Sequence, residues 1–358
     1  MNRFLRQRCF SNILIIKPSS LGDVVRCLPI LSGLHRRFPG ARISWMIRPD
    51  CADLLKSSPY LNDIIDFDRY RFGRVGRSTQ ASWELIKFLN SLRSNNFDLV
   101  LDLQGLFRSG FIGLCTGAPI RLGFAHAREF SPIFYTHRVA IPHRAEHVVD
   151  SYWRFARHLG FGEQKKTFDL PIDPDAEKTA KTLLSYSGLP AKRPFVILLI
   201  GGTNSAKCWP PARFAALAQA LKKHYHIASV LLGAGPVENT AAQQLMQIAN
   251  KNTKIVNLVD KTSLLQAIAL IENARLVVGN DSGPLHIAAA LSVPLVGLYG
   301  PTDPVVVGPY GQNDGIVRAG PARLENQRYS QNPEHRIENI TVERVIRVVE
   351  RKIGSSQR

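Results

Sequence analysis

The segment VVGNDSGPLHIAAALSVPLVGLYGPTDP at 277–304 constrains the fold more than any other part of the chain. Short apolar runs near its two ends are bounded by Gly and Pro, as buried strands are. Residues 284–291 between them have the composition of a helix with Pro284 in its first turn. The loop at 279–283 therefore leads into a helix N-terminus, between two strands of an α/β sheet.

Such a helix start predicts an anion site, because its free backbone N–H groups and the helix dipole attract negative charge. A phosphate is the expected guest. The candidate residues are Asp281, Ser282, Gly283 and, one turn into the helix, His286. The structural alternative is that Asp281 or Ser282 only caps the helix.

The alternation of strand and helix runs through the whole chain and predicts two doubly wound α/β halves. The expected strands are 13–16, 42–47, 64–67, 99–103, 195–200, 228–232, 255–257, 276–278 and 295–299, and the expected helices are 24–38, 81–94, 176–187, 211–223, 238–249, 263–272, 284–291 and 341–353. A Pro-containing stretch at 165–192 separates two domains, 1–172 and 173–358. Ligands are expected at the carboxyl ends of the strands, in the cleft between the two sheets. We also consider that the last helix crosses back to brace the first half.

The formal charge of +18 predicts an anionic partner, which on charge alone is a nucleic acid, an acidic lipid surface or a phosphorylated substrate. Five cysteines, odd in number and without a Cys-x-x-Cys pair, argue against a disulfide framework or a zinc site and favour a reducing cytoplasm. No apolar stretch reaches the length of a signal-peptide core or a membrane span. We expect a cytoplasmic protein that at most rests on a membrane.

The loop KPSSLGD at 17–23 follows the first expected strand. Asp23 is a candidate general base that takes a proton from a substrate hydroxyl, with Ser20 and Gly22 beside it where an acceptor approaches. The alternative is that Asp23 caps the helix expected from residue 24, where the dipole stabilises its charge and weakens it as a base.

The loop GGTNSAKCWP at 201–210 follows the first strand of the second half, and its small residues allow close approach to phosphate oxygens. Thr203 and Lys207 are its candidate donor-binding residues, and a solvated surface lysine is the alternative. The Walker spacing is absent. Gly233 and Gly235 form a fragment of a dinucleotide fingerprint, and a plain turn is expected there.

Arginine is concentrated at 69–77, and two further arginines lie on later loops of the same half. Guanidinium groups suit phosphate and carboxylate groups on a substrate, whereas a solvated loop is the alternative. The candidate acceptor-binding arginines are Arg69, Arg71, Arg74, Arg77, Arg108 and Arg128. Two Asp-x-Asp pairs, 66–68 and 173–175, are interpreted as structural, so no metal site is expected.

Four segments together resemble glycosyltransferase family 9, the ADP-heptose:lipopolysaccharide heptosyltransferases. They are KPSSLGDVV at 17–25, LDLQGLFRSG at 101–110, KCWP at 207–210, and GNDSGPLHIAAAL with GLYGPTDP at 279–304. The match runs in order through nearly the whole chain. Residues 127–130 and the segment at 143–161 look more like heptosyltransferase I, which adds the first heptose to Kdo, than heptosyltransferase II.

The resemblance implies a GT-B fold, with the acceptor on the first Rossmann-like domain and the nucleotide sugar on the second. It implies heptose transfer from ADP-heptose to the Kdo or inner core of lipopolysaccharide, with inversion and with neither metal nor cofactor. The implied partners are this donor, a Kdo–lipid A acceptor and the anionic inner-membrane surface, where the enzyme is peripheral on the cytoplasmic face; nucleic acid is not among them.

The resemblance also assigns roles to single residues. Asp23 matches the general base, Lys207 matches a lysine on the phosphate side of the donor, and Glu238 falls near a ribose-binding glutamate. Residues 281–283 and His286 match the donor loop. Pro284 departs from the family pattern: because it has no N–H, phosphate contacts must come from Gly283 or Leu285.

Two alternatives remain open from the sequence. One is a family member that uses another nucleotide sugar or acceptor, because base and phosphate contacts do not read the identity of the sugar. The other is a non-catalytic binder of an anionic glycan or nucleic acid, which would bind DNA in a salt-sensitive way and would not need Asp23.

Overall fold

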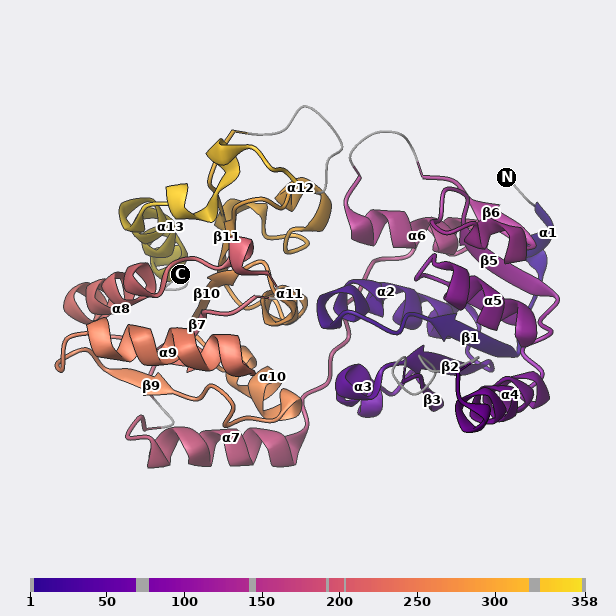
Figure 1. The fold of residues 1–358 in the computed structure, drawn as a ribbon, viewed down its shortest axis with the longest axis horizontal. Helices are drawn as coiled ribbons and strands as arrows, with labels where there is room; N and C mark the ends of the chain where they lie inside the picture. The colour runs from indigo at the N-terminus through magenta and orange to yellow at the C-terminus, as the bar shows by residue number, and fades with distance from the viewer. Residues whose placement is uncertain are drawn as a thin grey trace. The chain divides into compact units, whose positions relative to one another are not determined.

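The computed structural model describes residues 3–68, 77–141, 146–190, 193–202, 204–321 and 329–355. The chain divides into two compact units (Figure 1). The first consists of Met1–His143 and Val148–Pro171, and the second of Arg144–His147 and Ile172–Arg358. Each unit is an α/β layer structure with its own sheet.

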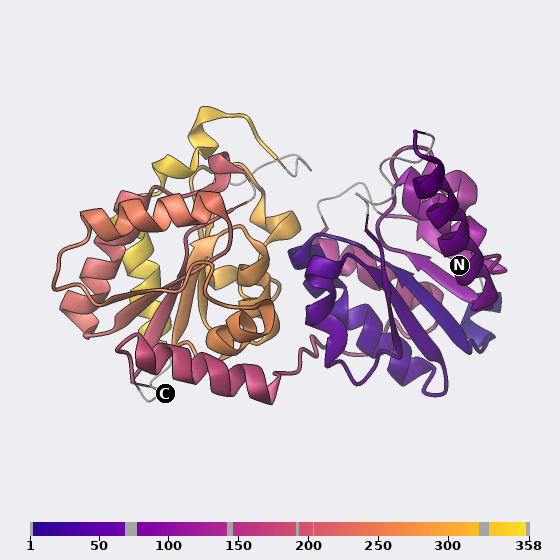
Figure 2. The same cartoon turned by 60° about the horizontal axis from the view of Figure 1, so that its bottom comes forward.

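The first unit contains a six-stranded parallel sheet in the order β3-β2-β1-β4-β5-β6. Its strands are β1 (Asn12–Ile16), β2 (Arg42–Ile47), β3 (Asp63–Asp66), β4 (Leu99–Asp102), β5 (Ile120–Phe124) and β6 (His137–Val139). Its helices are α1 (Arg3–Gln7), α2 (Leu21–Arg37), α3 (Pro49–Lys56), α4 (Thr79–Ser94), α5 (Phe107–Cys115) and α6 (Val148–His158). Helices cover both faces of the sheet (Figure 2), which is why β1 and β4 are continuous apolar runs.

The second unit repeats this plan in the order β12-β11-β10-β7-β8-β9, again with every strand parallel. Its strands are β7 (Phe195–Leu199), β8 (Ala228–Leu232), β9 (Ile255–Asn257), β10 (Leu276–Asn280), β11 (Leu295–Tyr299) and β12 (Ile316–Arg318). Its helices are α7 (Pro174–Tyr186), α8 (Pro211–Tyr225), α9 (Pro236–Ile248), α10 (Leu264–Glu272), α11 (Gly283–Ala290), α12 (Pro304–Val307) and α13 (Val342–Ser355). Helix α8 packs against α9 and α13, whereas α10 packs against α7 and α11.

Numbered within its own unit, each sheet has the Rossmann strand order 3-2-1-4-5-6. The order reverses between β1 and β4 in the first unit, and between β7 and β10 in the second. Ligands of such sheets bind outside the carboxyl ends of the strands at this reversal. The sequence motifs lie there, because 17–23 follows β1, 103–106 follows β4, 201–210 follows β7 and 281–282 follows β10.

Two expectations about helices are wrong. Helix α13 does not cross back to the first half: Val345, Val349 and Ile353 lie in the core of the second unit, because its apolar stripe is buried on α8 and the sheet edge. Helix α2 begins at Leu21 rather than at residue 24, with Ser20 in the N-cap position. Serine is a preferred N-cap, and an acidic residue is favoured in the first turn, so Asp23 lies inside the helix.

All five cysteines are free thiols. Cys27 on α2 is fully buried, and this burial raises the pKa of its thiol to about 12, so it behaves as a core residue. Within the described ranges, no helix is long and apolar enough to cross a membrane.

Candidate active site

Asn280 ties together the two loops at the strand reversal of the second unit. This fully buried residue ends β10, and its Oδ1 accepts a hydrogen bond from the Trp209 N–H at 3.0 Å. Its Nδ2 donates to the carbonyl oxygens of Ile200 at 3.0 Å and Gly201 at 3.2 Å. Both ends of the loop that carries Lys207 are therefore fixed to the end of β10.

Lys207 and Asp281 form an ion pair at this edge, with Nζ 2.7 Å from Oδ2. The His286 Nε2 lies 3.6 Å from the other carboxylate oxygen. Burial raises the pKa of the Asp281 carboxyl, but the neighbouring His286 and Lys207 outweigh burial and hold that pKa well below its usual range. Asp281 is thus an anion that orients Lys207 and the His286 ring, which come from two different elements.

The start of α11 supplies backbone donors beside this ion pair. Ser282 is the N-cap and Gly283 the first residue of the helix. Leu285 N–H donates to the Ser282 carbonyl oxygen at 3.2 Å, so of the two donors considered from the sequence, Gly283 is the one that is left for a ligand. The Ser282 Oγ is also buried without a hydrogen-bond partner among the described residues. The geometry is that of an anion site.

Glu238 lies in the first turn of α9, packed over glycines of two loops. A Cβ on Gly201 would lie 2.2 Å from the Glu238 Cγ and Oε1, and one on Gly233 would lie 3.0 Å from Cγ. Gly235, with φ of +113°, forms the N-cap of α9. The glycines predicted to form a plain turn therefore also make room for this carboxylate, which lies at the ends of β7 and β8.

Asp23 is the corresponding polar side chain of the first unit. Its Oδ1 accepts a hydrogen bond from an Arg26 guanidinium nitrogen at 2.8 Å. Its Oδ2 accepts from the backbone N–H of Ser20 at 3.4 Å and the Ser20 hydroxyl at 3.3 Å. Arg26 is almost fully buried, whereas Asp23 is partly exposed. The carboxylate is thus oriented from inside the helix and open toward solvent.

Asp102 fixes the second loop at this strand reversal and was not predicted as a site residue. It ends β4, is fully buried, and accepts from the N–H groups of Gln104 at 2.9 Å and Gly105 at 3.0 Å. Its other oxygen accepts from the Ser109 hydroxyl at 2.8 Å and the Tyr135 hydroxyl at 2.7 Å. Burial raises the pKa of Asp102 despite these donors.

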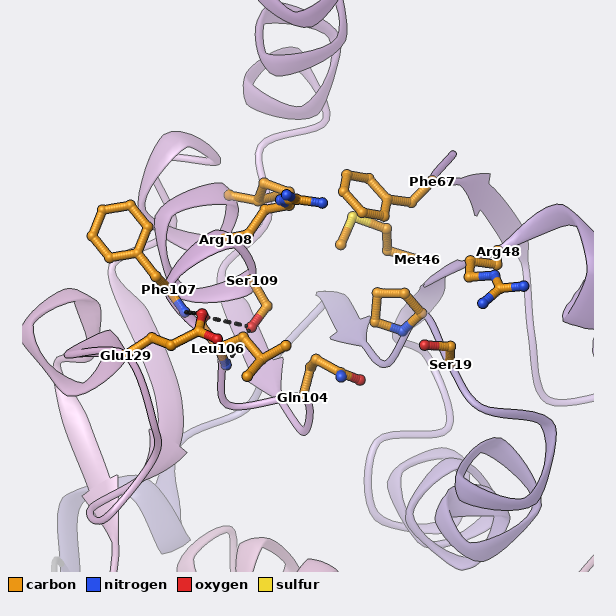
Figure 3. Close-up of a pocket in the computed structure, with 12 residues that line it drawn as sticks. Ser19, Met46, Arg48, Phe67, Gln104, Leu106, Phe107, Arg108, Ser109 and Glu129 are labelled. Atoms are coloured by element: carbon orange, nitrogen blue, oxygen red, sulfur yellow. Dashed lines mark hydrogen bonds between the residues drawn. The ribbon is translucent and has the colours of Figure 1, made fainter. Parts of the chain in front are cut away.

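A cavity of about 370 Å³ opens beside these loops (Figure 3). It is bounded by residues that follow four strands and by the start of α5: Pro18, Ser19, Met46, Arg48, Phe67, Gln104, Leu106, Phe107, Arg108, Ser109, Ile112 and Glu129. Figure 3 shows Arg108 and Arg48 on different walls of this cavity. The cavity therefore combines apolar surface with two guanidinium groups, as an anionic, partly apolar ligand requires.

The predicted acceptor-binding residues are brought together only in part. Arg108 lines the cavity, Ser20 and Gly22 adjoin its Ser19 wall, and Arg128 precedes Glu129 on its rim. Arg77 is exposed and lines a separate shallow groove beside α4. Four predicted residues lie outside the described ranges: Arg69, Arg71, Arg74 and, on the donor side, Thr203.

Sequence reasoning missed Arg48, Phe67, Gln104 and Glu129 as cavity residues. Arg48 directly follows β2 and Phe67 directly follows β3, so position at a strand end was the available signal. Arg48 forms a two-pronged ion pair with Asp50 in the first turn of α3. This pairing orients its guanidinium at the cavity wall.

In the part of the chain that is described, no group of three or more His, Cys, Asp or Glu side chains gathers in a metal-binding arrangement. Within the second Asp-x-Asp pair, Asp173 caps α7 by accepting from the Ala176 N–H at 2.7 Å, which gives this carboxylate a structural contact. The interpretation of both pairs as structural stays a prediction.

Two units with the Rossmann strand order, each with a polar site at its strand reversal, are the plan of the GT-B fold, which this chain shares with the E. coli heptosyltransferase WaaC. The model of glycosyltransferase family 9 (heptosyltransferase) matches residues 85–337, and the chain belongs to this family. Lipopolysaccharide heptosyltransferases 1 and 2 of Escherichia coli K12 are each 28% identical to it, over 88% of this chain and 95% of the relative for the first, and over 86% and 87% for the second.

The E. coli heptosyltransferase WaaC with ADP superimposes with a TM-score of 0.76 at 26% sequence identity, over 95% of this chain and 99% of the other. The same enzyme with ADP-2-deoxy-2-fluoro heptose gives a TM-score of 0.74 at 25% identity, with the same coverage. The protein is therefore a glycosyltransferase.

The Asn280 clamp yields a first prediction. Asn280→Asp removes the donor to two carbonyl oxygens and puts a carboxylate against them, so the free energy of unfolding should fall by at least about 2 kcal/mol in urea denaturation. The matched control is Asn339→Asp, because the exposed Asn339 also donates to two carbonyl oxygens, those of Pro333 and Glu334. It should change stability by less than about 0.5 kcal/mol. Equal losses in the two variants would contradict the clamp.

Proposed function

We propose that this glycosyltransferase moves heptose from ADP-heptose to the Kdo or inner core of lipopolysaccharide, with inversion and without a metal. The observation that carries the proposal is that the strand reversals of the two units carry different and complementary polar groups. One unit presents an oriented carboxylate beside a cavity with arginines, and the other presents a lysine and a backbone N–H at a helix start. The names of the relatives support the reaction class.

The second unit is the proposed nucleotide-sugar unit, and residues 173–358 form it. Lys207 and the Gly283 N–H are aimed at the diphosphate, so they stabilise the charge that develops as ADP leaves. Asp281 keeps Lys207 in place and accepts hydrogen bonds from sugar hydroxyls, while Glu238 binds the ribose. Binding of ADP and of an ADP-heptose analogue to the E. coli relative supports ADP-heptose as the donor.

The first unit, residues 1–172, is the proposed acceptor unit. Asp23 takes the proton of an acceptor hydroxyl as that oxygen attacks the anomeric carbon on the face opposite ADP, which inverts its configuration. Arg26 keeps the carboxylate oriented for this step. Arg48 and Arg108 bind the carboxylate and phosphate groups of the acceptor. Transfer requires both substrates at one reaction centre, so the two units close around them during the reaction.

Two finer points belong to the proposal. The acceptor is Kdo–lipid A, as for heptosyltransferase I, on the basis of segment 127–130. The enzyme works at the cytoplasmic face of the inner membrane, to which a chain with a charge of +18 is attracted by anionic lipid.

The reaction is tested by assaying a panel of nucleotide sugars with Kdo–lipid A. We expect transfer from ADP-heptose and full activity in excess EDTA, because Lys207 and the α11 N-terminus supply the positive charge at the leaving group. Activity with a different donor only would place the enzyme elsewhere in the family. Loss of activity in EDTA that magnesium or manganese restores would overturn metal independence.

Asp23→Asn keeps the shape of the side chain but removes the proton acceptor. Turnover should fall by about 10²–10⁴-fold while the affinity for ADP-heptose stays nearly unchanged. The control is Asp175→Asn, which changes an exposed carboxylate in the first turn of α7 and should leave turnover unaltered. Normal turnover of Asp23→Asn in a single-turnover assay would remove the base assignment.

Lys207→Met removes the cation nearest to the proposed diphosphate site. The affinity for ADP, measured by titration calorimetry, should fall by about 1–3 kcal/mol, as for other hydrogen bonds to charged groups. Lys181→Met is the matched control, since Lys181 pairs with Glu177 on the surface of α7. An ADP affinity equal to that of the unmodified protein would count against the role of Lys207.

A further inference from the structure

Helix α5 carries an exposed apolar stripe beside the cavity of the first unit. Phe107, Phe111 and Leu114 are spaced as neighbours on one side of the helix, and all three are exposed. The next segment adds Phe130, 83% exposed, and Ile133, 65% exposed. We call these five residues the α5 apolar face.

The side chains of this face pack against one another and against the buried Phe134 ring. The Phe107 and Phe111 rings stack with centroids 6.4 Å apart, and the Phe134 ring packs edge-on against both, at 5.1 and 6.1 Å. Phe134 belongs to the short 3₁₀ turn Ser131–Phe134, which packs against α5. Phe130 and Ile133 are thus held next to the helix stripe.

Phe130 is exposed by a backbone conformation that is unfavourable for its residue type. Glu129 and Phe130 both have φ of +56°, in the left-handed region that bulky side chains rarely adopt. The turn is maintained by Arg128 N–H donating to the Gly105 carbonyl oxygen at 3.1 Å and by Phe107 N–H donating to Glu129 Oε2 at 3.2 Å. The exposed position of the Phe130 ring therefore comes with an unfavourable backbone conformation.

Several arginines lie next to this face along the chain. Between 107 and 141 the sequence has four arginines and one acid, Glu129. Arg108, Arg128 and Arg138 are exposed there, and Arg138 Nε donates to the Pro132 carbonyl oxygen at 3.2 Å. Exposed aromatic and aliphatic side chains with exposed arginines beside them match the interface of an anionic bilayer, which accepts apolar groups at the acyl boundary and cations at the headgroups.

The face is continuous with the cavity. Phe107, Arg108 and Glu129 line the cavity, and Figure 3 shows the Phe107 ring pointing outward, away from Met46 and Ser19 on the opposite wall. A surface that contacts the bilayer at this position would bring the cavity mouth to the level of the lipid headgroups.

We propose that the α5 apolar face inserts into the interfacial region of an anionic bilayer and presents the cavity to a membrane-anchored acceptor. The part that concerns the acceptor rests on the proposed function, whereas the membrane contact does not. A second copy of this chain is the less suitable occupant, because the exposed arginines beside two such faces would repel each other.

The test uses the full-length variant Phe130→Asn/Ile133→Asn, which spares the cavity lining. Asn tolerates a positive φ better than Phe, so this variant should remain folded. The control Tyr186→Asn/Ile248→Asn removes comparable exposed surface from the second unit, where these residues are 88% and 52% exposed. Cosedimentation is measured with phosphatidylethanolamine–phosphatidylglycerol vesicles and with phosphatidylcholine vesicles.

The unmodified protein and the control should bind the anionic vesicles and bind phosphatidylcholine weakly. The Phe130→Asn/Ile133→Asn variant should lose about tenfold in partition, because two side chains no longer enter the interface. It should also lose transfer to Kdo–lipid A in vesicles while retaining transfer to a water-soluble, deacylated Kdo acceptor.

Unchanged vesicle binding of the variant, or an equal loss in the control, would overturn the proposal. A dimer of the unmodified protein that dissociates in the variant, seen by light scattering, would assign the face to a second copy instead. Absence of transfer by the unmodified protein to either acceptor would refute the proposed function, while the vesicle measurement would still decide whether the face binds lipid.

Discussion

The site depends on one buried polar side chain at the end of the fourth strand of each sheet. Asp102 ends β4 and Asn280 ends β10, and these are equivalent positions in the two units. Each satisfies backbone groups of a loop at the strand reversal, where the chain leaves the sheet and has no ladder partner. A buried group of this kind costs free energy unless every polar atom is paired. These hydrogen bonds therefore hold the loops at the ends of the strands.

The two ends differ in a way that fits their different tasks. Asn280 is neutral and holds the loop that carries Lys207, so the charge at that edge belongs to Lys207, Asp281 and the helix N-terminus. Asp102 accepts hydrogen bonds from four donors, one of which is the Tyr135 hydroxyl. The Tyr135 ring occupies the space that a side chain on Gly123 would need. This leaves the cavity above it lined by Arg48, Arg108 and apolar groups. One edge thus suits a diphosphate, and the other suits a larger, amphiphilic partner.

Much of the fold could be predicted because most of its strands are marked by short sequence patterns. The strands at 42–47, 228–232, 255–257 and 295–299 have the predicted ends, since each is an apolar or β-branched run bounded by polar residues, Gly or Pro. Strands β5, β6 and β12 were not predicted. Arg121 and Gly123 interrupt the apolar run of β5, and the three-residue strands β6 and β12 are defined by pairing with β5 and β11 rather than by any pattern of their own. The loop at 279–283 and the helix after it were predictable from their motif, but the Lys207–Asp281 contact was not, since it joins residues 74 positions apart through the parallel pairing of β7 with β10.

The start of α2 was mispredicted for a reason that bears on chemistry. Ser20 and Asp23 are both good capping residues, and only the structure shows that Ser20 takes the N-cap position and Asp23 the first turn. In that position the carboxylate accepts hydrogen bonds from Arg26 and from Ser20, and these contacts fix its direction. A group that is already oriented needs no rearrangement when a substrate arrives, which is one of the ways a site lowers a reaction barrier. In its proposed role as base, Asp23 therefore contributes through its position in the first turn of α2.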